Sequence, residues 1–348
     1  MRARHRWTAL IAVGVLVAAT SVFAVVQAQH HGGGEGMVSV ASIRYRPFLL
    51  FRSTALNKDY GTVELTTVQG PGQERALTAL RCERVAYAGG RGICLSSGAG
   101  GLFSSTRAVV FDADFKPLYT IPLQGYPSRT SVSRDGHYGA TTDFVGADSY
   151  ATAGFSTRTF IFDLRTGRKL FDLEQMQVYR NGSRFEDADF NFWGVTFALD
   201  NTHFYATLGS DNQTYLVEGD VATEVATVLR TGVECPSLSP DGKEIAFKQR
   251  NPGSEVTWRL SVLDLATMQA HPLAETRDVD DQAAWLDNST VAYGLAQGAG
   301  GSAGSTSGLS EMSAGASIAT DTWEVPADGG GHPRMLLAGA WSLVPAQS

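Results

Sequence analysis

The sequence predicts an all-β fold, a six-bladed β-propeller preceded by an N-terminal signal peptide or anchor helix. Three observations lead to this prediction. A five-residue turn segment recurs five times between residues 87 and 289, and a strand with apolar residues on both of its faces follows these turns. An apolar run of 19 residues lies ahead of the repeats, at the N-terminus.

The N-terminal segment has the arrangement of an export signal. Arg2, Arg4 and Arg6 precede the apolar run 8–26, which ends in small residues at the positions that a signal peptidase reads, Val26-Gln27-Ala28. A run of this length is also long enough to cross a bilayer as a helix. Residues 1–28 are therefore expected to be either a cleaved signal peptide or an uncleaved membrane anchor. Both place the rest of the chain outside the cytoplasm, in the cell envelope, the periplasm or the secreted fraction.

The charge of the chain indicates which kinds of partner to expect, and its cysteines bear on the cellular compartment. The chain of 348 residues carries 28 Lys and Arg against 35 Asp and Glu, so no nucleic-acid partner is expected. Cys82 and Cys94 lie on either side of a predicted hairpin turn and are expected to pair, because an exported protein sits where disulfides persist. Cys235 is then expected to be a buried, small apolar residue.

The recurring turn segment defines the repeat. Its fourth residue is always Gly or Asn, the types that tolerate a positive φ, and Asp before Gly or Asn is a strong hairpin signal. The intervals between these fourth residues are 46, 65, 41 and 46, which suits four-stranded propeller blades of about 40–50 residues with an insertion in the longest interval. The five copies are Tyr87–Arg91, Ser133–His137, Ala198–Thr202, Ser239–Lys243 and Trp285–Ser289.

The strand after each turn is apolar on both faces in most copies, as expected for sheets that are stacked on both sides. The copy that contains Gly139 and Thr141 fits this pattern least well. The residues three and five places beyond the Gly or Asn are Ile93 and Leu95, Gly139 and Thr141, Phe204 and Ala206, Ile245 and Phe247, and Val291 and Tyr293.

One copy carries a family resemblance. The segment Ser239-Pro240-Asp241-Gly242-Lys243-Glu244-Ile245-Ala246-Phe247 resembles the repeat signature of TolB-like propellers. The other four copies are degenerate, and the first one lacks the Asp. The resemblance extends as architecture over roughly residues 45–345. It implies a six-bladed propeller in an exported protein that interacts with other proteins, and it does not identify the partner.

Five turn segments account for five blades, and the sixth must be closed by the tail. Residues 45–80 offer three strands but no turn segment before them. The tail Ala340–Pro345 is therefore expected to supply the missing innermost strand, since ring closure removes open sheet edges. The propeller is expected over residues 45–348, and residues 29–44 are expected to be a flexible tether.

Loop lengths favour one face of this propeller for binding. If the strands of a blade are labelled A to D from the axis outward, the A–B and C–D links are short. Long B–C loops are expected near residues 97–106, 145–158 and 295–320, and a long D–A loop at 175–191. Long loops commonly carry function, so the face with the B–C and D–A loops is expected to bind the partner. Neutral lengthening on a tolerant surface is the alternative.

Two segments on that face supply candidate binding residues. The stretch Tyr179–Trp193 mixes arginine, acidic and aromatic residues, as interface anchors do; its candidates are Arg180, Arg184, Glu186, Asp187, Asp189 and Trp193. The alternative is that its aromatic residues only pack the insertion onto the rim. In the second segment, Asp278, Asp280 and Asp281 precede an A strand and could face the channel mouth. Such carboxylates suit Ca²⁺, but their spacing matches no calcium loop, and a solvated acidic surface is the alternative.

No catalytic residue, metal ligand or cofactor site is assigned. Gly300-Gly301-Ser302-Ala303-Gly304 has the spelling of a nucleophile elbow, but it lies in a Gly/Ser/Ala-rich run rather than between a strand and a helix. The sequence therefore predicts an exported, non-enzymatic and monomeric module. Its partner would be a protein, a peptide or a cell-envelope component, and it would contact the membrane only through an uncleaved N-terminal segment. The alternative is a propeller enzyme, a lyase or hydrolase, with a cation bound in its channel.

Overall fold

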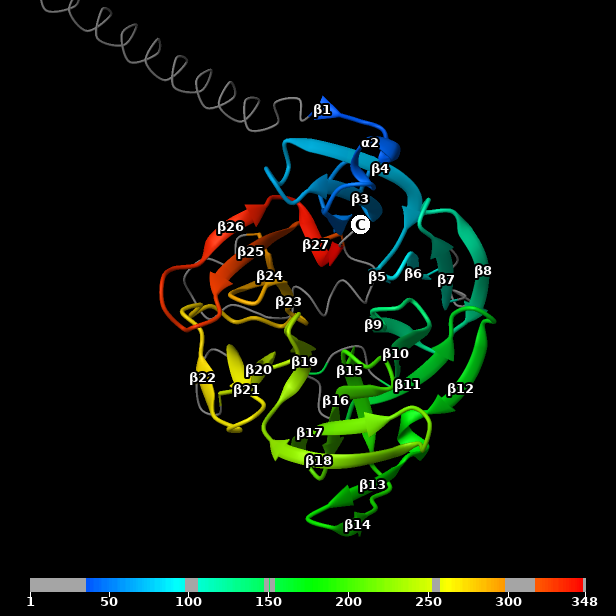
Figure 1. Cartoon of the computed structure of the whole chain (residues 1–348), viewed down its shortest axis with the longest axis vertical. Helices are drawn as coiled ribbons and strands as arrows, with labels where there is room; N and C mark the ends of the chain where they lie inside the picture. Colours follow the sequence, from blue (N-terminus) through cyan, green and yellow to red (C-terminus); the bar gives the residue numbers. More distant parts are fainter. Residues whose placement is uncertain are drawn as a thin grey trace, which may run out of the picture.

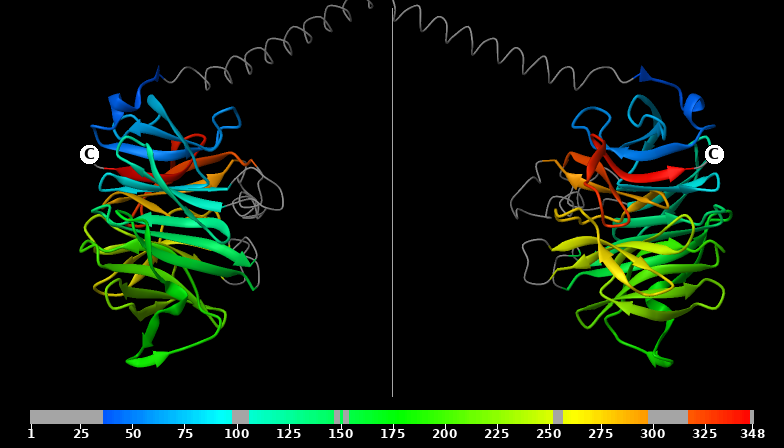
Figure 2. Two further views of the ribbon diagram at one scale, coloured as in Figure 1. Left: turned by 90° about the vertical axis from the view of Figure 1, so that its right-hand side faces the viewer. Right: turned by 60° about the vertical axis from the view of Figure 1, so that its left-hand side comes forward.

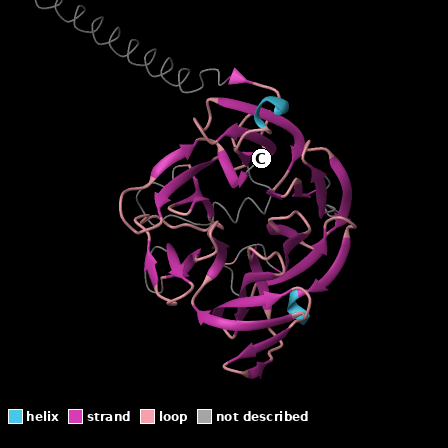
Figure 3. Cartoon of the chain, in the orientation of Figure 1, coloured by secondary structure: helices cyan, strands magenta, loops and turns pink. Residues whose placement is uncertain are grey.

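Six antiparallel sheets, each with four core strands, stand around a common axis (Figure 1). The computed structural model describes residues 36–97, 106–146, 150, 154–251, 257–297 and 317–346. Within these residues the regular structure is strand, apart from the short helix α2 (Val40–Ile43) and the 3-10 turn η2 (Leu173–Gln175) (Figure 3). The prediction of an all-β, six-bladed propeller is confirmed. The expected signal or anchor helix lies outside the described residues.

The first three blades are built mainly from the N-terminal half of the chain. Their strands are given from the axis outward. Blade I contains β27 (Ala340–Ala346), β2 (Phe48–Ser53), β3 (Thr62–Thr67) and β4 (Glu74–Arg81). Blade II contains β5 (Arg84–Ala88), β6 (Arg91–Ser97), β7 (Thr106–Asp112) and β8 (Pro117–Pro122). Blade III contains β9 (Tyr126–Val132), β10 (Tyr138–Gly146), β11 (Ser156–Asp163) and β12 (Arg168–Asp172).

The other three blades complete the ring. Blade IV contains β15 (Asn191–Phe197), β16 (His203–Ser210), β17 (Gln213–Asp220) and β18 (Val225–Thr231). Blade V contains β19 (Glu234–Leu238), β20 (Glu244–Arg250), β21 (Trp258–Asp264) and β22 (Ala270–Pro272). Blade VI contains β23 (Ala284–Asp287), β24 (Thr290–Ala296), β25 (Thr320–Pro326) and β26 (Arg334–Leu337).

The C-terminal strand closes the ring, as the sequence predicts. β27 pairs antiparallel with β2, with Phe48 opposite Ala346 and Ser53 opposite Ala340. All six residues of β2 are buried, so without β27 this strand would present an apolar open edge. Closure places the end of β27 beside the axis (Figure 1).

The turn segments form a ring on one side of the disc. The fourth residues Gly90, Gly136, Asn201 and Gly242 have φ between 65° and 77°, as expected, whereas Asn288 in the fifth segment does not have a positive φ. Neighbouring turns also bond to each other: the Asn201 side chain accepts from the Asp135 N–H, and the Asn288 side chain accepts from the Asp241 N–H. This side is called the turn face below, and the side with the B–C and D–A loops is called the loop face.

The insertion between blades III and IV is a hairpin rather than an irregular loop. β13 (Gln177–Arg180) pairs antiparallel with β14 (Ser183–Phe185) and parallel with β18, so blade IV has six strands. The hairpin extends past the rim of the disc (Figure 2). The expectation of a long D–A loop over residues 175–191 is corrected in this respect, because β18 offers an unpaired edge that the segment covers.

The chain ahead of β2 packs onto blade I for part of its length. β1 (Gly36–Met37) pairs parallel with β4, and Ile43 of α2 is buried against the blade. Residues 36–44, part of the expected tether, therefore belong to the folded unit because they cover the outer edge and core of blade I. Residues 29–35 lie outside the described residues.

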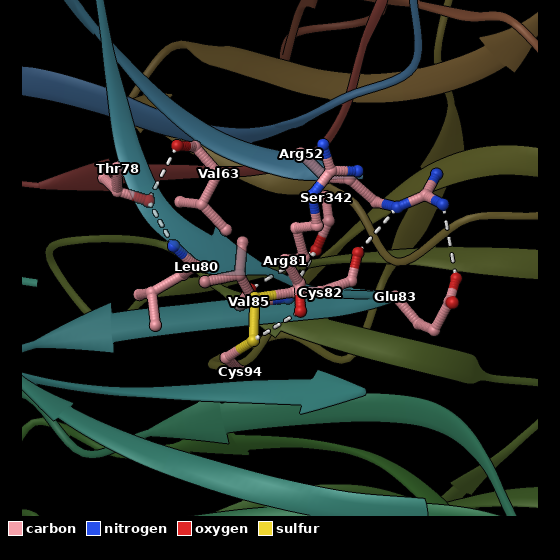
Figure 4. The surroundings of a disulfide bond; sticks show 10 residues. All are labelled: Arg52, Val63, Thr78, Leu80, Arg81, Cys82, Glu83, Val85, Cys94 and Ser342. Carbon is pink, nitrogen blue, oxygen red and sulfur yellow. Dashed lines mark hydrogen bonds and ion pairs between the residues drawn. A yellow bond between two sulfur atoms is a disulfide. The ribbon is translucent and has the colours of Figure 1, made fainter. Parts of the chain in front are cut away.

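A disulfide joins the closing blade to its neighbour. Cys82 follows β4 of blade I and Cys94 lies in β6 of blade II, with their Cα atoms 5.2 Å apart (Figure 4). Both are buried, and the Cys82 carbonyl accepts a 2.7 Å hydrogen bond from Arg52 Nε. Cys235 is a buried free thiol.

Several expected features fall where the structure gives no description. These are the loop residues 98–105, 147–149, 151–153 and 298–316, which include the Gly300–Gly304 segment. Among the described residues, no helix is long and apolar enough to cross a membrane.

Candidate functional site

The six A strands enclose a central cavity of about 250 Å³, called the channel cavity here. Residues from all six A strands line it, including Arg84, Arg129, Trp285 and Leu343. Pro240, which belongs to the turn segment of blade V, lies in its wall, so the cavity extends towards the turn face.

Buried charges gather at the loop-face ends of the A strands. We call this set the charged layer; it consists of Arg84, Arg129, Glu234, Lys248, Asp280 and Asp281. Arg84 and Glu234 are the first residues of their A strands, and Asp280 and Asp281 lie just before β23. These positions converge because every A strand begins on the loop face, next to the axis.

Ion pairs and aromatic rings hold the charged layer together. Lys248 Nζ lies 2.5 Å from Asp280 and Arg84 lies 3.0 Å from Asp281. Burial alone would raise the pKa of Asp280, but Lys248 and then Arg129 hold it below its usual value. The Arg84 guanidinium lies 3.6 Å from the ring centroid of Trp341 and Lys248 lies 4.2 Å from that of Trp258, so these rings take the place of water around the cations.

The acidic segment that contains Asp278, Asp280 and Asp281 is not the solvated surface considered above, because its carboxylates are buried or half-buried. Asp280 and Asp281 are only 5% and 3% exposed, and each has a cationic partner from another blade. Asp278 is half-buried and accepts a 2.8 Å hydrogen bond from the Trp258 N–H. Asp280 and Asp281 neutralise buried cations instead of forming an open cluster. Within the residues that the structure describes, no three His, Cys, Asp or Glu side chains gather closely enough to hold a metal ion.

A groove of about 590 Å³ lies on the loop face between blades III and IV, with Arg250 of blade V at one side. It is called the loop-face groove. Its aromatic side is formed by Tyr150, Phe155 and Trp193, and its polar lining is Ser156, Asp189, Asn191, Ser210, Asn212, Gln213, Thr214 and Arg250, with backbone at Gly154 and Gly209.

A tight turn beside a long loop forms the groove. The B–C link of blade IV is only Asp211-Asn212, both with positive φ (48° and 57°), which is a primed hairpin turn. The B–C segment of blade III is much longer and brings Tyr150 over the blade. Gly209 has no Cβ, and an added Cβ would meet the Trp193 ring at 2.8 Å, so only glycine lets the indole lie against β16.

The polar groups of the groove are held in place by their neighbours. Asp189 accepts hydrogen bonds from Ser210 Oγ (2.6 Å) and from the Asp211 N–H (2.8 Å). Arg250 donates to Glu234 (2.8 Å) and to the carbonyl of Tyr150 (3.0 Å). The groove therefore presents a fixed carboxylate from blade IV and a fixed guanidinium from blade V, and little rotamer entropy would be lost on binding.

The structure places the six candidate binding residues of the insertion in two different locations. Asp189 and Trp193 line the groove. Arg180, on β13, donates to the Tyr215 hydroxyl (3.3 Å) at the rim, while Arg184 and Glu186 form an exposed ion pair at 2.5 Å. Asp187 is exposed and caps the following N–H. These four lie on or beside the peripheral hairpin and are not brought into the groove.

The aromatic residues of the insertion are packing residues. Phe185 and Phe190 meet edge to face at 5.1 Å and pack on the core of blade IV. Trp193 is 1% exposed and stacks on Tyr150 with the ring centroids 5.1 Å apart. Trp193 therefore contributes to the groove as a buried ring packed against Tyr150 rather than as an exposed side chain. It lies in β15, where alternate residues point into the core between blades.

The sequence analysis did not identify the three buried cations of the charged layer as site residues. Arg84, Arg129 and Lys248 lie singly in strands, and no local pattern distinguishes them from surface cations. Asp211-Asn212 could have been found, because two adjacent turn-forming residues between apolar strands are a hairpin signal.

The architecture is that of a six-bladed β-propeller with a TolB-like fold. No protein-family model matches the chain, and no curated protein matches its sequence. Solved structures match in fold. TolB from Acinetobacter baumannii is 14% identical, with a TM-score of 0.53 over 86% of this chain and 66% of that one.

Two other solved structures illustrate the range of proteins with this architecture. A puromycin-hydrolyzing peptidase from Mycobacterium tuberculosis is 13% identical, with a TM-score of 0.50 over 84% of this chain and 45% of that one. A chain of a nidogen/laminin complex is 11% identical, with a TM-score of 0.51 over 85% of this chain and 97% of that one. The present chain thus spans less than two thirds of the TolB chain and less than half of the peptidase chain, and the likeness is one of fold.

Proposed function

We propose that this protein is an exported, non-catalytic binding module that takes a protein or peptide partner in the loop-face groove. The observation that carries the proposal is the groove itself, about 590 Å³ in volume, on the face with the long loops. It combines apolar ring surface with a few fixed polar groups, which is the usual composition of a recognition site.

The chemistry of the groove suits an extended peptide. Asn212 and Gln213 place amide groups at its edge, and amides can both donate to and accept from a peptide backbone. Asp189 and Arg250 add opposite charges from two blades, so a segment with a basic and an acidic side chain would be bound in one direction. Arg180, Arg184, Glu186 and Asp187 form a second, peripheral polar surface that a larger protein partner could also contact.

Two features support an extracytoplasmic location. The first 28 residues have the pattern of a signal peptide or anchor, and the buried Cys82–Cys94 disulfide suits an oxidising compartment.

A protein partner is in keeping with one of the proteins of similar fold. The nidogen/laminin complex, one chain of which is similar to this chain in fold, is by its name an assembly of proteins. A cell-envelope component remains the other class of partner in this proposal, and membrane contact would come only from an uncleaved N-terminal segment.

Site-specific photo-crosslinking in the producing cells tests the proposal. A photoreactive residue replaces the exposed Gln213 in the groove, and the matched control replaces the exposed Lys243 in a turn on the opposite face. We expect a defined adduct from position 213 that is absent from position 243, and we expect D189A to weaken it. Equal labelling from both positions, or adducts only from position 243, would contradict the assignment of the groove.

An enzyme with a channel-bound cation is the competing function. A cation in the channel cavity would lie beside Arg84 and Arg129, and two guanidinium groups would repel it. The aspartates of the charged layer are already engaged by cationic side chains. Metal analysis of the purified chain separates the two proposals, because a stoichiometric divalent ion would favour the enzyme.

A further inference from the structure

Tyr150 forms a wall that the loop-face groove shares with the charged layer. Its ring lies on the aromatic side of the groove, where it stacks on Trp193. The ring centroid also lies 5.1 Å from the guanidinium carbon of Arg129 and 5.2 Å from Nζ of Lys248, two cations of the charged layer. Tyr150 is only 3% exposed, so a shift of this residue would change both the groove and the cover over these cations.

Tyr150 is held in place from two different blades. Its hydroxyl lies 2.6 Å from Ser128 Oγ of β9, in its own blade III. Its backbone carbonyl accepts a 3.0 Å hydrogen bond from Nη2 of Arg250, which belongs to β20 of blade V. Blades III and V are not neighbours in the ring, because blade IV lies between them (Figure 1). The hydrogen bond from Arg250 therefore ties Tyr150 to a blade on the other side of blade IV.

Arg250 is itself fixed by a buried carboxylate. Its Nε donates a 2.8 Å hydrogen bond to Glu234 Oε1, and Glu234 Oε2 accepts one of 3.2 Å from the Trp258 indole N–H. The side chain of Arg250 is 45% exposed, whereas that of Glu234 is fully buried and is not among the described residues that line the groove. A half-exposed arginine samples many rotamers unless a partner fixes it, and a charge-assisted hydrogen bond to a buried carboxylate is a strong way to do so.

We propose that Glu234 and Arg250 are positioning residues of the loop-face groove. The buried carboxylate fixes Arg250, and Arg250 fixes Tyr150 where it gives the groove its aromatic wall. A wall that is already in place costs less to order on binding, so these contacts raise the affinity of the groove for its partner. This effect on binding rests on the proposed function, but the series of contacts from Glu234 to Tyr150 does not depend on a partner.

Fluorine NMR of a labelled Tyr150 tests the positioning without the partner. A meta-fluorotyrosine is placed at position 150 of the full chain, and its resonance is recorded in the wild type, in Arg250→Met and in Glu234→Gln. In both variants we expect the resonance to move towards its position in the urea-unfolded protein, because the ring loses its fixed place against Trp193. Both variants should fold, since Arg250 reaches solvent and Glu234→Gln keeps the shape of the side chain.

Two controls separate this effect from a general loss of structure. Arg158→Met removes an arginine of blade III that is 40% exposed and paired with Asp172 at 3.0 Å, and it should leave the resonance at position 150 unchanged. A meta-fluorotyrosine at Tyr293, which is buried in blade VI, should give the same resonance in the wild type and in all three variants. An unmoved resonance at position 150 in Arg250→Met and Glu234→Gln would overturn the positioning.

Photo-crosslinking from position 213 then measures the effect on binding. We expect the adduct yield to fall about tenfold in Arg250→Met and Glu234→Gln, as for the loss of one charge-assisted hydrogen bond, and to stay unchanged in Arg158→Met. Glu234→Gln is the decisive variant, because Arg250 lines the groove and could also contact the partner directly. A moved resonance with an unchanged adduct yield in Glu234→Gln would overturn the effect on binding. A wild type without any adduct would contradict the proposed function instead, and the resonance at position 150 would still decide whether Glu234 and Arg250 position the ring.

Discussion

A buried carboxyl between blades II and III gives a direct test of the packing. Asp143 is fully buried in β10, neither of its carboxyl oxygens makes a hydrogen bond of normal geometry, and the backbone of Gln124 is the polar group that favours its charged form. It shares a face of β10 with Gly139, where an added Cβ would meet Ile93 of blade II at 2.5 Å. Asp143 therefore points into the interface between these two blades, without a charged partner there.

Burial raises the pKa of Asp143 to about 7 from an ordinary value of 3.8. A raised pKa means that the folded chain binds the proton more tightly than the unfolded chain. The stability that this group contributes is fully present below about pH 4 and is lost as the pH rises to about 7. The difference between these two pKa values corresponds to about 4 kcal/mol of unfolding free energy.

The perturbation is Asp143→Asn, which keeps the shape and removes the titration. We expect the two proteins to have similar free energies of unfolding near pH 4, and the variant to become more stable by up to about 4 kcal/mol at pH 8. Urea unfolding of both proteins, at intervals from pH 4 to pH 8, measures this difference. The matched control is Asp187→Asn at an exposed position, which should show no such divergence. Parallel curves for the wild type and Asp143→Asn would refute the reasoning.

Three further predictions concern stability. Asp280→Asn should cost about 3–5 kcal/mol because it leaves Lys248 buried without its counter-ion, and an added Lys248→Met should recover much of that loss in the same urea assay. Replacing Cys82 and Cys94 by alanine should cost about 3 kcal/mol by the loop-entropy estimate for a separation of 12 residues, and an unchanged urea midpoint would show that the bond adds nothing. Deleting residues 340–348 should lower the melting temperature markedly and promote aggregation, because β2 loses its partner strand; a full-length-like melting curve would argue against ring closure.

Some elements of the fold could be read from local residues, and others could not. The turn segment around Asp241-Gly242 and the apolar strand after it predicted a blade, because turn chemistry and strand alternation act over a few residues. The hairpin β13–β14 was expected as a loop, since its assignment depends on β18, whose open edge lies about 50 residues away in sequence. The sequence left open whether Trp193 binds a partner or packs the insertion, because composition does not show which face of a strand is buried.

The sequence by itself determined the repeat, the number of blades and the closing role of the tail. These follow from short-range rules on turns, alternation and sheet edges. Only the tertiary structure decided the charged layer, the channel cavity and the loop-face groove. Arg84 and Asp281, for example, meet across 197 residues because the ring brings the starts of all A strands to one axis. Which side chains meet there depends on the closure of the whole ring, and no local segment carries that information.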